Sequence, residues 1–334
     1  MVSRGALISG VGPSPGADAY LSLVQTLPVN VHRSSLWKAV WATVLFGSVP
    51  ACIRVMDMDS YALGLWRLTL AAAGMTVILL VQGRSLREIA TAVRRDWKAL
   101  TAMGVCFGLH WLTYFQSIKL ASASIGALAF STCGVQLPML GWLFGFGRPR
   151  LSAMLGVMLA MAGSVMCLPR DDGGGDMALG LAIGILSGTL YAALPMLHQR
   201  HARLDDELRT WSQFTFALPV FLLTAPAADW SLSLSDFWLV LYLGLVVNLI
   251  GHYLWVQLST DLPLPTTSAL GYLQLPAALA FNYLLIGEQM TAGMLGGAAC
   301  IVAGNVLALG TTKLPPIESE LPDQMCSDGG EHGS

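Results

Sequence analysis

The chain has 334 residues, of which 54% are hydrophobic and only 11% are charged, and its mean hydropathy is +0.62. Soluble domains carry roughly 25% charged residues, so this composition excludes a soluble globular protein. The net charge of −2 gives no reason to expect a nucleic acid partner. The six cysteines lack the spacing of a metal site, and we expect neither a metal nor a cofactor.

In chain order, residues 1–35 are punctuated by Gly, Pro and Ser, which predicts a loose cytoplasmic N-terminal arm. Apolar segments of about 20 residues follow, the length that crosses a bilayer as an α-helix. We expect ten spans in an all-α integral membrane protein, at residues 36–54, 61–82, 99–117, 121–145, 151–168, 178–198, 211–226, 237–258, 263–286 and 291–310. Residues 314–334 are acidic and rich in Pro, Ser and Gly, which predicts a disordered cytoplasmic tail.

The positions of lysine and arginine test this topology. With the N-terminus inside, the cytoplasmic side holds Arg4, Arg33, Lys38, Arg84, Arg87, Arg94, Arg95, Lys98, Arg148, Arg150, Arg200, Arg203, Arg209 and Lys313. The opposite side holds only Arg54, Lys119 and Arg170. This bias follows the positive-inside rule. It predicts an even number of spans, with both termini cytoplasmic, in a plasma or inner membrane.

Two stretches of the chain resemble each other. Gln136-Leu-Pro138 and Met154-Leu-Gly156 return as Gln274-Leu-Pro276 and Met294-Leu-Gly296, 138 and 140 residues later. We infer two copies of a five-helix unit, at 36–168 and 178–310, joined by an acidic, glycine-rich linker at 170–176. Because five is odd, the second copy must enter the membrane upside down. Such inverted repeats are typical of transporters and enclose a central cavity near the bilayer midplane.

His110 in the third span and His252 in the eighth occupy matching places, each followed by an aromatic residue and a leucine. His110 lies about 18 Å from Lys98 inside, and His252 about 24 Å from Asp236 outside, at 1.5 Å of rise per residue. Both fall in the middle of a core about 30 Å thick. A histidine there is either a neutral ring hydrogen-bonded between helices, or part of a cavity that binds substrate or takes a proton.

Arg67 is the only cation well inside a predicted span. It lies nearer the outer end, about 9 Å in from Tyr61. An arginine at the bilayer centre costs roughly 2.5–3.5 kcal/mol on insertion scales. The side chain therefore snorkels, pairs with a neighbouring helix, or anchors an anionic or carboxylate-bearing substrate.

Prolines fall at equivalent places of the first and sixth spans, and of the fourth and ninth: Pro50, Pro195, Pro138 and Pro276. A proline frees a carbonyl in its helix, which is tolerated where it faces protein or a cavity. Gln136 and Gln274, two residues before their prolines, are placed to satisfy such a carbonyl or to contact substrate. Polar and aromatic neighbours suggest an amphipathic pocket, with packing as the alternative for each: Tyr114, Tyr191, His198, Trp255, Tyr272 and Asn282.

Glu288 follows Gly287 at the head of the tenth span, where a carboxylate complements the positive end of a helix. Small residues recur in the fifth and tenth spans, for example Gly293, Gly296, Gly297, Ala303 and Gly304. They suit close helix packing, with a homodimer interface through these spans as a further expectation. The chain has no Walker loop, zinc-protease motif or nucleophile elbow, so we expect no enzymatic activity.

Over residues 36–310, the chain resembles the drug/metabolite transporter superfamily, specifically its EamA-type members with ten spans. The resemblance rests on Trp66-Arg67, Leu109-His110-Trp111, the stretch Ser131–Pro138, Tyr272-Leu-Gln274 and Gly287-Glu288 with Gly296 and Gly304. It implies a secondary transporter, commonly an exporter of amino acids or related compounds. It also implies a cavity lined mainly by the first, third, fourth, sixth, eighth and ninth spans. The family's first Gly-Glu is Gly147-Arg148 here, so no coupling role is carried over to Glu288.

We therefore expect an exporter of a small organic metabolite that works by alternating access. The expected substrate-binding residues are Arg67, His110, Tyr114, Gln136, Tyr191, His252, Trp255, Tyr272 and Gln274. One alternative is a flippase or translocator of a lipid-linked or nucleotide-linked head group, which a lipid-open groove and a basic cavity would favour. The other is a non-transporting sensor or accessory subunit, which a closed, dry interior would favour.

Overall fold

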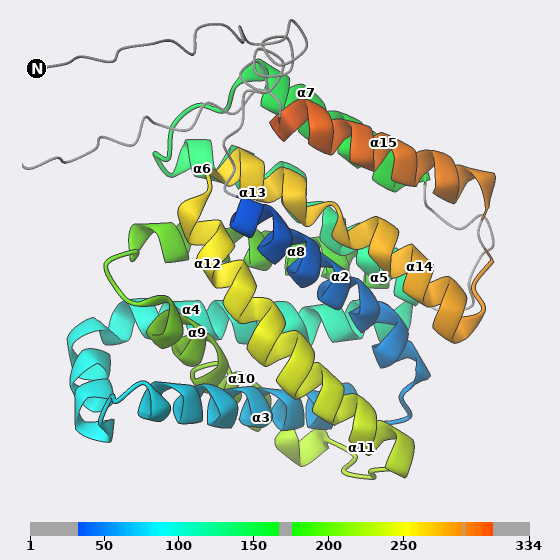
Figure 1. Ribbon diagram of the computed structural model, residues 1–334. Helices are drawn as coiled ribbons and strands as arrows, with labels where there is room; N and C mark the ends of the chain where they lie inside the picture. Colours follow the sequence, from blue (N-terminus) through cyan, green and yellow to red (C-terminus); the bar gives the residue numbers. More distant parts are fainter. Residues whose placement is uncertain (1–32, 167–175, 290, 310–334) are drawn as a thin grey trace, which may run out of the picture. The chain divides into compact units, whose positions relative to one another are not determined.

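The computed structural model describes residues 33–166, 176–289 and 291–309, and every element in these ranges is a helix (Figure 1). They are α2 (Arg33–Val55), α3 (Ser60–Val81), α4 (Leu86–Leu120), α5 (Ala123–Ser131), α6 (Cys133–Leu143), α7 (Leu151–Met166), α8 (Met177–Arg200), α9 (Asp206–Thr215), α10 (Leu218–Leu222), the 3₁₀ helix η1 (Ala225–Ala227), α11 (Leu234–Leu241), the π-helix η2 (Tyr242–His252), α12 (Tyr253–Asp261), α13 (Leu264–Gly271), α14 (Gln274–Ile286) and α15 (Ala292–Leu309). The expected tail at 314–334, nearly all of the arm at 1–35 and nearly all of the linker at 170–176 lie outside the described residues.

The ends of several helices follow from local sequence. Ser85 and Glu88 form a capping box before α4, in which the Glu88 amide donates to Ser85 Oγ and the Ser85 amide donates to Glu88 Oε2. Asp59 caps α3 by accepting a hydrogen bond from the amide of Tyr61. Gly287, with φ of 69°, ends α14 in the left-handed conformation that glycine adopts at little cost.

Helices occupy all ten expected spans, although four spans are built from consecutive helices: α5–α6, α9–α10, α11–η2–α12 and α13–α14. Within the described ranges, six stretches are long and apolar enough to cross a membrane: Trp37–Val55, Ser60–Val81, Ala123–Leu143, Met177–Arg200, Leu234–Asp261 and Leu264–Ile286. Two shorter helices, Leu151–Met166 and Ala292–Gly304, are also apolar. The chain is thus a multi-pass membrane protein, and the count of ten crossings stays a prediction.

Two expected boundaries differ from the structure. The third span was expected at 99–117, but α4 already begins at Leu86 and bends at Asp96, whose φ of −117° and ψ of 21° are not helical. The seventh span was expected at 211–226, but α9 begins at Asp206 and the path then breaks into α10 and η1. Pro219 and Pro226 lie in the first turns of these two short helices, where a proline is tolerated.

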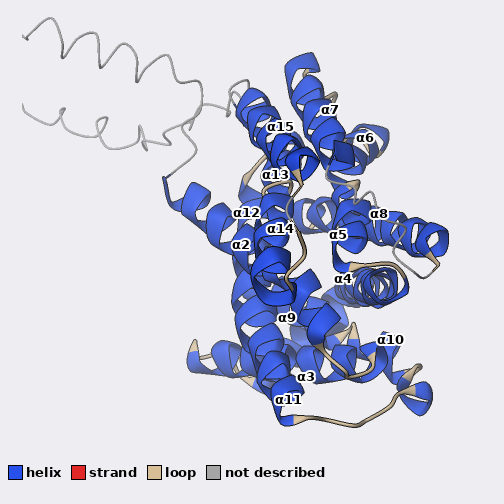
Figure 2. Cartoon of the chain, turned by 90° about the vertical axis from the view of Figure 1, so that its right-hand side faces the viewer, coloured by secondary structure: helices blue, strands red, loops and turns tan. Residues whose placement is uncertain are grey.

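Matching helices of the two copies pack against each other in antiparallel pairs. The α7–α15 pair lies side by side in both views (Figures 1 and 2). A Cβ added at Gly163 would lie 2.5 Å from Gly297 O, and one at Gly304 only 2.4 Å from Gly156 O. The start of α7 therefore faces the end of α15, and only glycine fits where the backbones touch.

Two further pairs have the same direction. Trp211 Nε1 of α9 donates to Thr76 Oγ1 of α3 at 2.9 Å, while Phe221 of α10 packs on Gly64 near the other end of α3. Ser268 of α13 donates to Gly134 O of α6, and Leu264 packs on Gly141. In all three pairs, helices that match in sequence order run in opposite directions, as an inverted repeat requires.

The small residues of α7 and α15 face each other within one chain. Their outward faces carry large exposed apolar side chains: Leu155, Met158, Leu295, Val302 and Val306. Apolar atoms on such a surface suit contact with lipid or with another copy of the chain. The homodimer through these helices stays a prediction, and it would use this outer face.

Candidate functional site

Three small cavities adjoin among the described residues where the two copies meet. The first has a volume of about 10 Å³ and is lined by Phe46, His110, Trp111, Tyr114, Phe130, Tyr191, His252 and Gln274. The second, about 20 Å³, includes Cys133, Pro195, Trp255 and Ser268, and the third, about 10 Å³, includes Ser131 and Tyr272. Phe130 and Gln274 line all three. Each cavity has room for about one water, so the centre is nearly closed.

Seven of the nine expected site residues line these cavities: His110, Tyr114, Tyr191, His252, Trp255, Tyr272 and Gln274. The lining comes from α2, α4, α5–α6, α8, η2–α12 and α13–α14. These are the six spans that the family resemblance implied. Arg67 and Gln136 do not line any of the three cavities, and the substrate role of all nine residues stays a proposal.

The two matching histidines have different surroundings. His110 Nδ1 lies 2.8 Å from Ser187 Oγ and 3.2 Å from Ser187 O, and Ser187 Oγ donates to His110 O at 3.0 Å. This contact links α4 to α8, as the packing interpretation of His110 predicts. His252 is also buried, but neither of its ring nitrogens has a hydrogen-bond partner in the described chain.

Aromatic rings hold His252 in place instead. Its ring centroid lies 4.5 Å from that of Phe46 and 4.7 Å from that of Phe107, the latter edge-on. His252 is the last residue of the π-helix η2, an 11-residue stretch. π-Helical turns are rare and are frequent at functional sites. The matching residue His110 lies in regular α-helix, so the repeat is not symmetric at this point.

Arg67 is only 1% exposed, which excludes snorkelling to the outer surface. Its Nη2 donates to Asn248 Oδ1 of η2 at 2.5 Å, so the interhelical pairing is present. Its guanidinium carbon lies 3.9 Å from the centroid of Trp111. Trp111 lines the first cavity and Arg67 does not, which places the charge beside the cavity wall.

The two glutamines also differ. Gln274 lines all three cavities, whereas Gln136 Nε2 donates to Thr132 Oγ1 at 3.2 Å within its own span. The carbonyl that Pro138 frees, Gly134 O, accepts its hydrogen bond from Ser268 of the other copy. The expectation that Gln136 satisfies this carbonyl is therefore wrong.

The lining residues that sequence reasoning missed include Phe46, Trp111, Phe130 and Cys133. Phe46 lies one turn before Pro50, and Trp111 follows His110, so both lie beside residues that the repeat marks. Phe130 and Cys133 carry no such signal, because a single phenylalanine or cysteine in an apolar span most often packs in the core. Conversely, His198 and Asn282 were expected in the pocket but line none of the three cavities.

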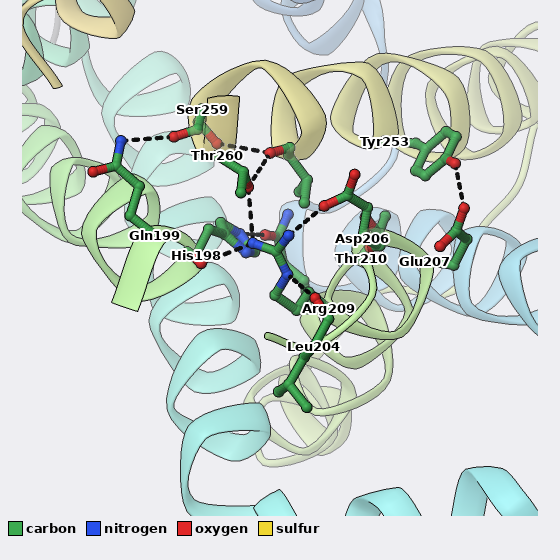
Figure 3. A network of polar contacts seen from close by, with 12 residues as sticks. His198, Gln199, Leu204, Asp206, Glu207, Arg209, Thr210, Tyr253, Ser259 and Thr260 are labelled. Atoms are coloured by element: carbon green, nitrogen blue, oxygen red, sulfur yellow. Dashed lines mark hydrogen bonds and ion pairs between the residues drawn. The ribbon is translucent and has the colours of Figure 1, made fainter. Parts of the chain in front are cut away.

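A polar network joins α8, α9 and α12 at the end of the molecule that the topology predicts to be cytoplasmic (Figure 3). Arg209, 1% exposed, donates to Leu204 O, His198 O and Thr260 Oγ1 and pairs with Asp206. Tyr253 OH donates to Glu207 at 2.5 Å in the same network. We call this set the inner network. It fastens the ends of the sixth and eighth spans to the start of the seventh.

Two further ion pairs lie at the same end. Arg84 pairs with Asp205, and Arg203 pairs with Asp96. Asp96 also accepts a hydrogen bond from Arg95 Nε at 2.8 Å. This hydrogen bond is the main reason that the pKa of the Asp96 carboxyl lies below its usual value, and Arg203 makes a smaller contribution in the same direction. The bend in α4 places this buried carboxylate between the two arginines.

Glu288 does not cap the tenth span. The helix α15 begins only at Ala292, and Glu288 Oε1 accepts a hydrogen bond from Ser124 Oγ of α5 at 2.5 Å. Asn282 Nδ2 donates to the same Ser124 at 3.0 Å. The expectation of a helix-dipole role is wrong, and the carboxylate instead links the fourth span to the ninth.

Comparison with known proteins identifies the family to which this arrangement of helices corresponds. A family model described as the EamA-like transporter family matches residues 33–168 and 178–310, which confirms the resemblance inferred from the sequence. A solved structure described as "Crystal structure of protein" has a TM-score of 0.67 and 18% identity, and the match covers 82% of this chain and 97% of that chain. At this identity the likeness concerns the fold alone. No curated protein matches the chain.

Proposed function

The chain belongs to the EamA-like transporter family, and from this premise we propose that it is a secondary transporter that exports a small organic metabolite, such as an amino acid or a related compound. It works by alternating access across a plasma or inner membrane, with both termini in the cytoplasm, and it is not an enzyme. The two copies form ten spans related by an inverted repeat around the central cavities. The antiparallel pairing of matching helices supports this arrangement.

One observation carries the proposal: the cavities lie between the copies and are lined by buried polar groups without partners. Tyr114, His252 and Trp255 each have at least one buried polar atom that no described residue satisfies. Such a group costs about 1–3 kcal/mol when left unpaired. A wall of unpaired groups fits a surface that meets a ligand better than it fits a packed core.

The inner network supports alternating access. It joins the cytoplasmic ends of three spans with buried hydrogen bonds and an ion pair, and the central cavities are too small for a metabolite. This combination is what an occluded step of the cycle requires. The two copies must separate at their cytoplasmic ends, where the pairs Arg84–Asp205 and Arg203–Asp96 join them, before substrate enters.

Of the two alternatives, the flippase receives little support. No Lys or Arg lines the three central cavities, and a single basic residue, Arg200, lines the larger cavity of about 180 Å³ between the end of α6 and α8. The non-transporting sensor retains one supporting observation, the small volume of the central cavities. It predicts that the interior never opens, whereas the transporter opens in every cycle.

A screen in cells tests the proposal. Overproduction of the wild-type protein should raise resistance to, or lower accumulation of, at least one toxic metabolite analogue in a broad panel. The variants His110→Ala, His252→Ala and Arg67→Ala should lose this effect at equal expression, because each alters the cavity or its charged wall. If all three variants behave as the wild type does, these residues do not bind the substrate. If the wild-type protein has no effect with any analogue, the sensor is favoured.

A further inference from the structure

The unpaired polar atoms at the centre share one chemical property. Within the described chain, the buried atoms without a partner include Trp111 Nε1, Trp255 Nε1, the Tyr114 hydroxyl and both ring nitrogens of His252. All four residues line the first or second cavity. An indole N–H can only donate, a tyrosine hydroxyl can donate, and a neutral histidine always carries one N–H. The site therefore offers an excess of donors.

These donors belong to one continuous cluster of rings. The centroid of Trp111 lies 5.8 Å from that of His252, His252 lies 4.5 Å from Phe46, and Phe46 lies 6.0 Å from Trp255. Tyr114 joins the cluster through Trp111 at 5.7 Å. A ligand with an apolar body and hydrogen-bond acceptors would meet ring surfaces and N–H groups together.

The charges around the site also favour a ligand that carries hydrogen-bond acceptors. No Asp or Glu lines any of the three described cavities. Arg67 stacks on Trp111, its Nε and Nη1 are buried without acceptors, and no described carboxylate lies within ion-pair distance of it. A buried charge without a counter-ion is costly. A negatively charged ligand would supply the counter-charge that Arg67 does not receive from the described part of the protein.

We propose that the central site binds a small organic anion, a carboxylate on an apolar or aromatic body. The carboxylate accepts hydrogen bonds from members of the donor cluster and is attracted by Arg67 behind Trp111. This inference rests on the proposed transport function and narrows its substrate class. Because no carboxylate lines the three described cavities, an ammonium group on the ligand would have no ion-pair partner there. A simple carboxylate therefore binds better than an amine or an amino acid of the same shape.

The test uses purified full-length protein and matched probe sets. Each set contains a carboxylate, its primary amide and the corresponding amine and amino acid, on short aliphatic and on phenyl-bearing bodies. Binding is measured as the rise in unfolding temperature with probe concentration, and transport as counterflow in proteoliposomes. We expect at least one carboxylate to bind tenfold or more tightly than its amide, amine and amino acid counterparts.

Conservative variants identify the donors. Trp255→Phe and Tyr114→Phe remove one N–H or O–H each while keeping a ring, and each should weaken carboxylate binding about tenfold. Trp238→Phe, at a 62% exposed position, is the matched control and should bind as the wild type does. The inference fails if no carboxylate binds better than its amide, or if neither cavity variant alters binding.

The two proposals fail separately. Counterflow of an amine or amino acid without preference for a carboxylate would contradict the proposed anion site and support the proposed transport function. Carboxylate binding that needs Trp255 and Tyr114, without counterflow of any probe, would keep the anion site and favour the sensor.

Discussion

His110 and His252 match in the repeat but differ in what surrounds them. His110 contacts Ser187 of α8, whereas both ring nitrogens of His252 lack partners. A buried ring nitrogen without a partner lowers stability, because it has lost its hydrogen bonds to water. The surroundings therefore assign His110 in part to holding two helices together, and they leave His252 free for the transport pathway.

This difference predicts opposite results for two phenylalanine variants. His110→Phe should lower the free energy of unfolding by about 1 kcal/mol, because it removes the contact to Ser187. His252→Phe should leave stability unchanged or raise it, yet lower transport at least tenfold. Thermal unfolding in detergent and counterflow in proteoliposomes measure the two quantities. A destabilised His252→Phe that still transports would contradict the assignment.

Asp96 predicts a pH dependence of stability. Its pKa in the folded protein is held below the usual value, chiefly by the hydrogen bond from Arg95. The ionised carboxylate therefore stabilises the fold above its unfolded pKa of about 3.9, and this stabilisation is lost as the pH falls through the lower folded value. The gap in unfolding temperature between wild type and Asp96→Asn should be full at pH 7 and shrink below about pH 4. An equal gap at both pH values would contradict this.

At the scale of residues, the sequence predicted which residues line the cavities better than it predicted their hydrogen-bond partners. The repeat and the midplane position were enough to select His110, His252 and Gln274. Asn248, which bonds Arg67, and Ser268, which bonds the carbonyl freed by Pro138, come from the opposite copy. Contacts between segments far apart in the sequence depend on packing that no local pattern encodes.

At the scale of elements, the α7–α15 pair depends on the absence of side chains. A Cβ at Gly304 would lie 2.4 Å from Gly156 O and 2.8 Å from Ala160 N, both backbone atoms that cannot rotate away. Gly304→Val should therefore force the helices apart and lower the free energy of unfolding by about 2 kcal/mol or more. Val306→Leu, at a 66% exposed position of the same helix, is the control and should be neutral. Equal unfolding temperatures for both variants would contradict this packing.

The sequence predicted where helices lie but not how they are interrupted. Apolar runs of bilayer length locate the spans to within a few residues, because burial in lipid requires them. Pro138 and Pro276 mark the breaks at Thr132 and between α13 and α14, because each removes the helical hydrogen bond to the residue four before it. The π-helix η2 follows no local rule that separates it from regular helix. The cavity residues of the fourth and ninth spans lie around these breaks, so their arrangement could be known only from the structure.

At the scale of the whole molecule, the two copies have diverged in charge. Arg67 and Arg209 are separated by 142 residues, as His110 and His252 are, and both arginines are 1% exposed. Arg209 has a carboxylate and three further acceptors at the inner end, whereas Arg67 has Asn248 and the rings of Trp111 and Phe115. One copy uses its arginine to close the molecule, and the other keeps its charge beside the cavities.

The central claim is that these cavities open to both sides of the membrane in turn. Cys133 lines two of the cavities and reports on this directly, in a variant whose other cysteines are replaced by alanine. A membrane-impermeant thiol reagent is applied to right-side-out and to inside-out vesicles, and the extent of labelling is measured. A variant that keeps only Cys300, which packs between α7 and α15, is the control.

The account predicts labelling of Cys133 from both sides, little labelling of Cys300, and faster labelling of Cys133 from the cytoplasmic side when Arg209→Met weakens the inner network. Labelling of Cys133 from one side only, or from neither with and without Arg209→Met, would contradict it.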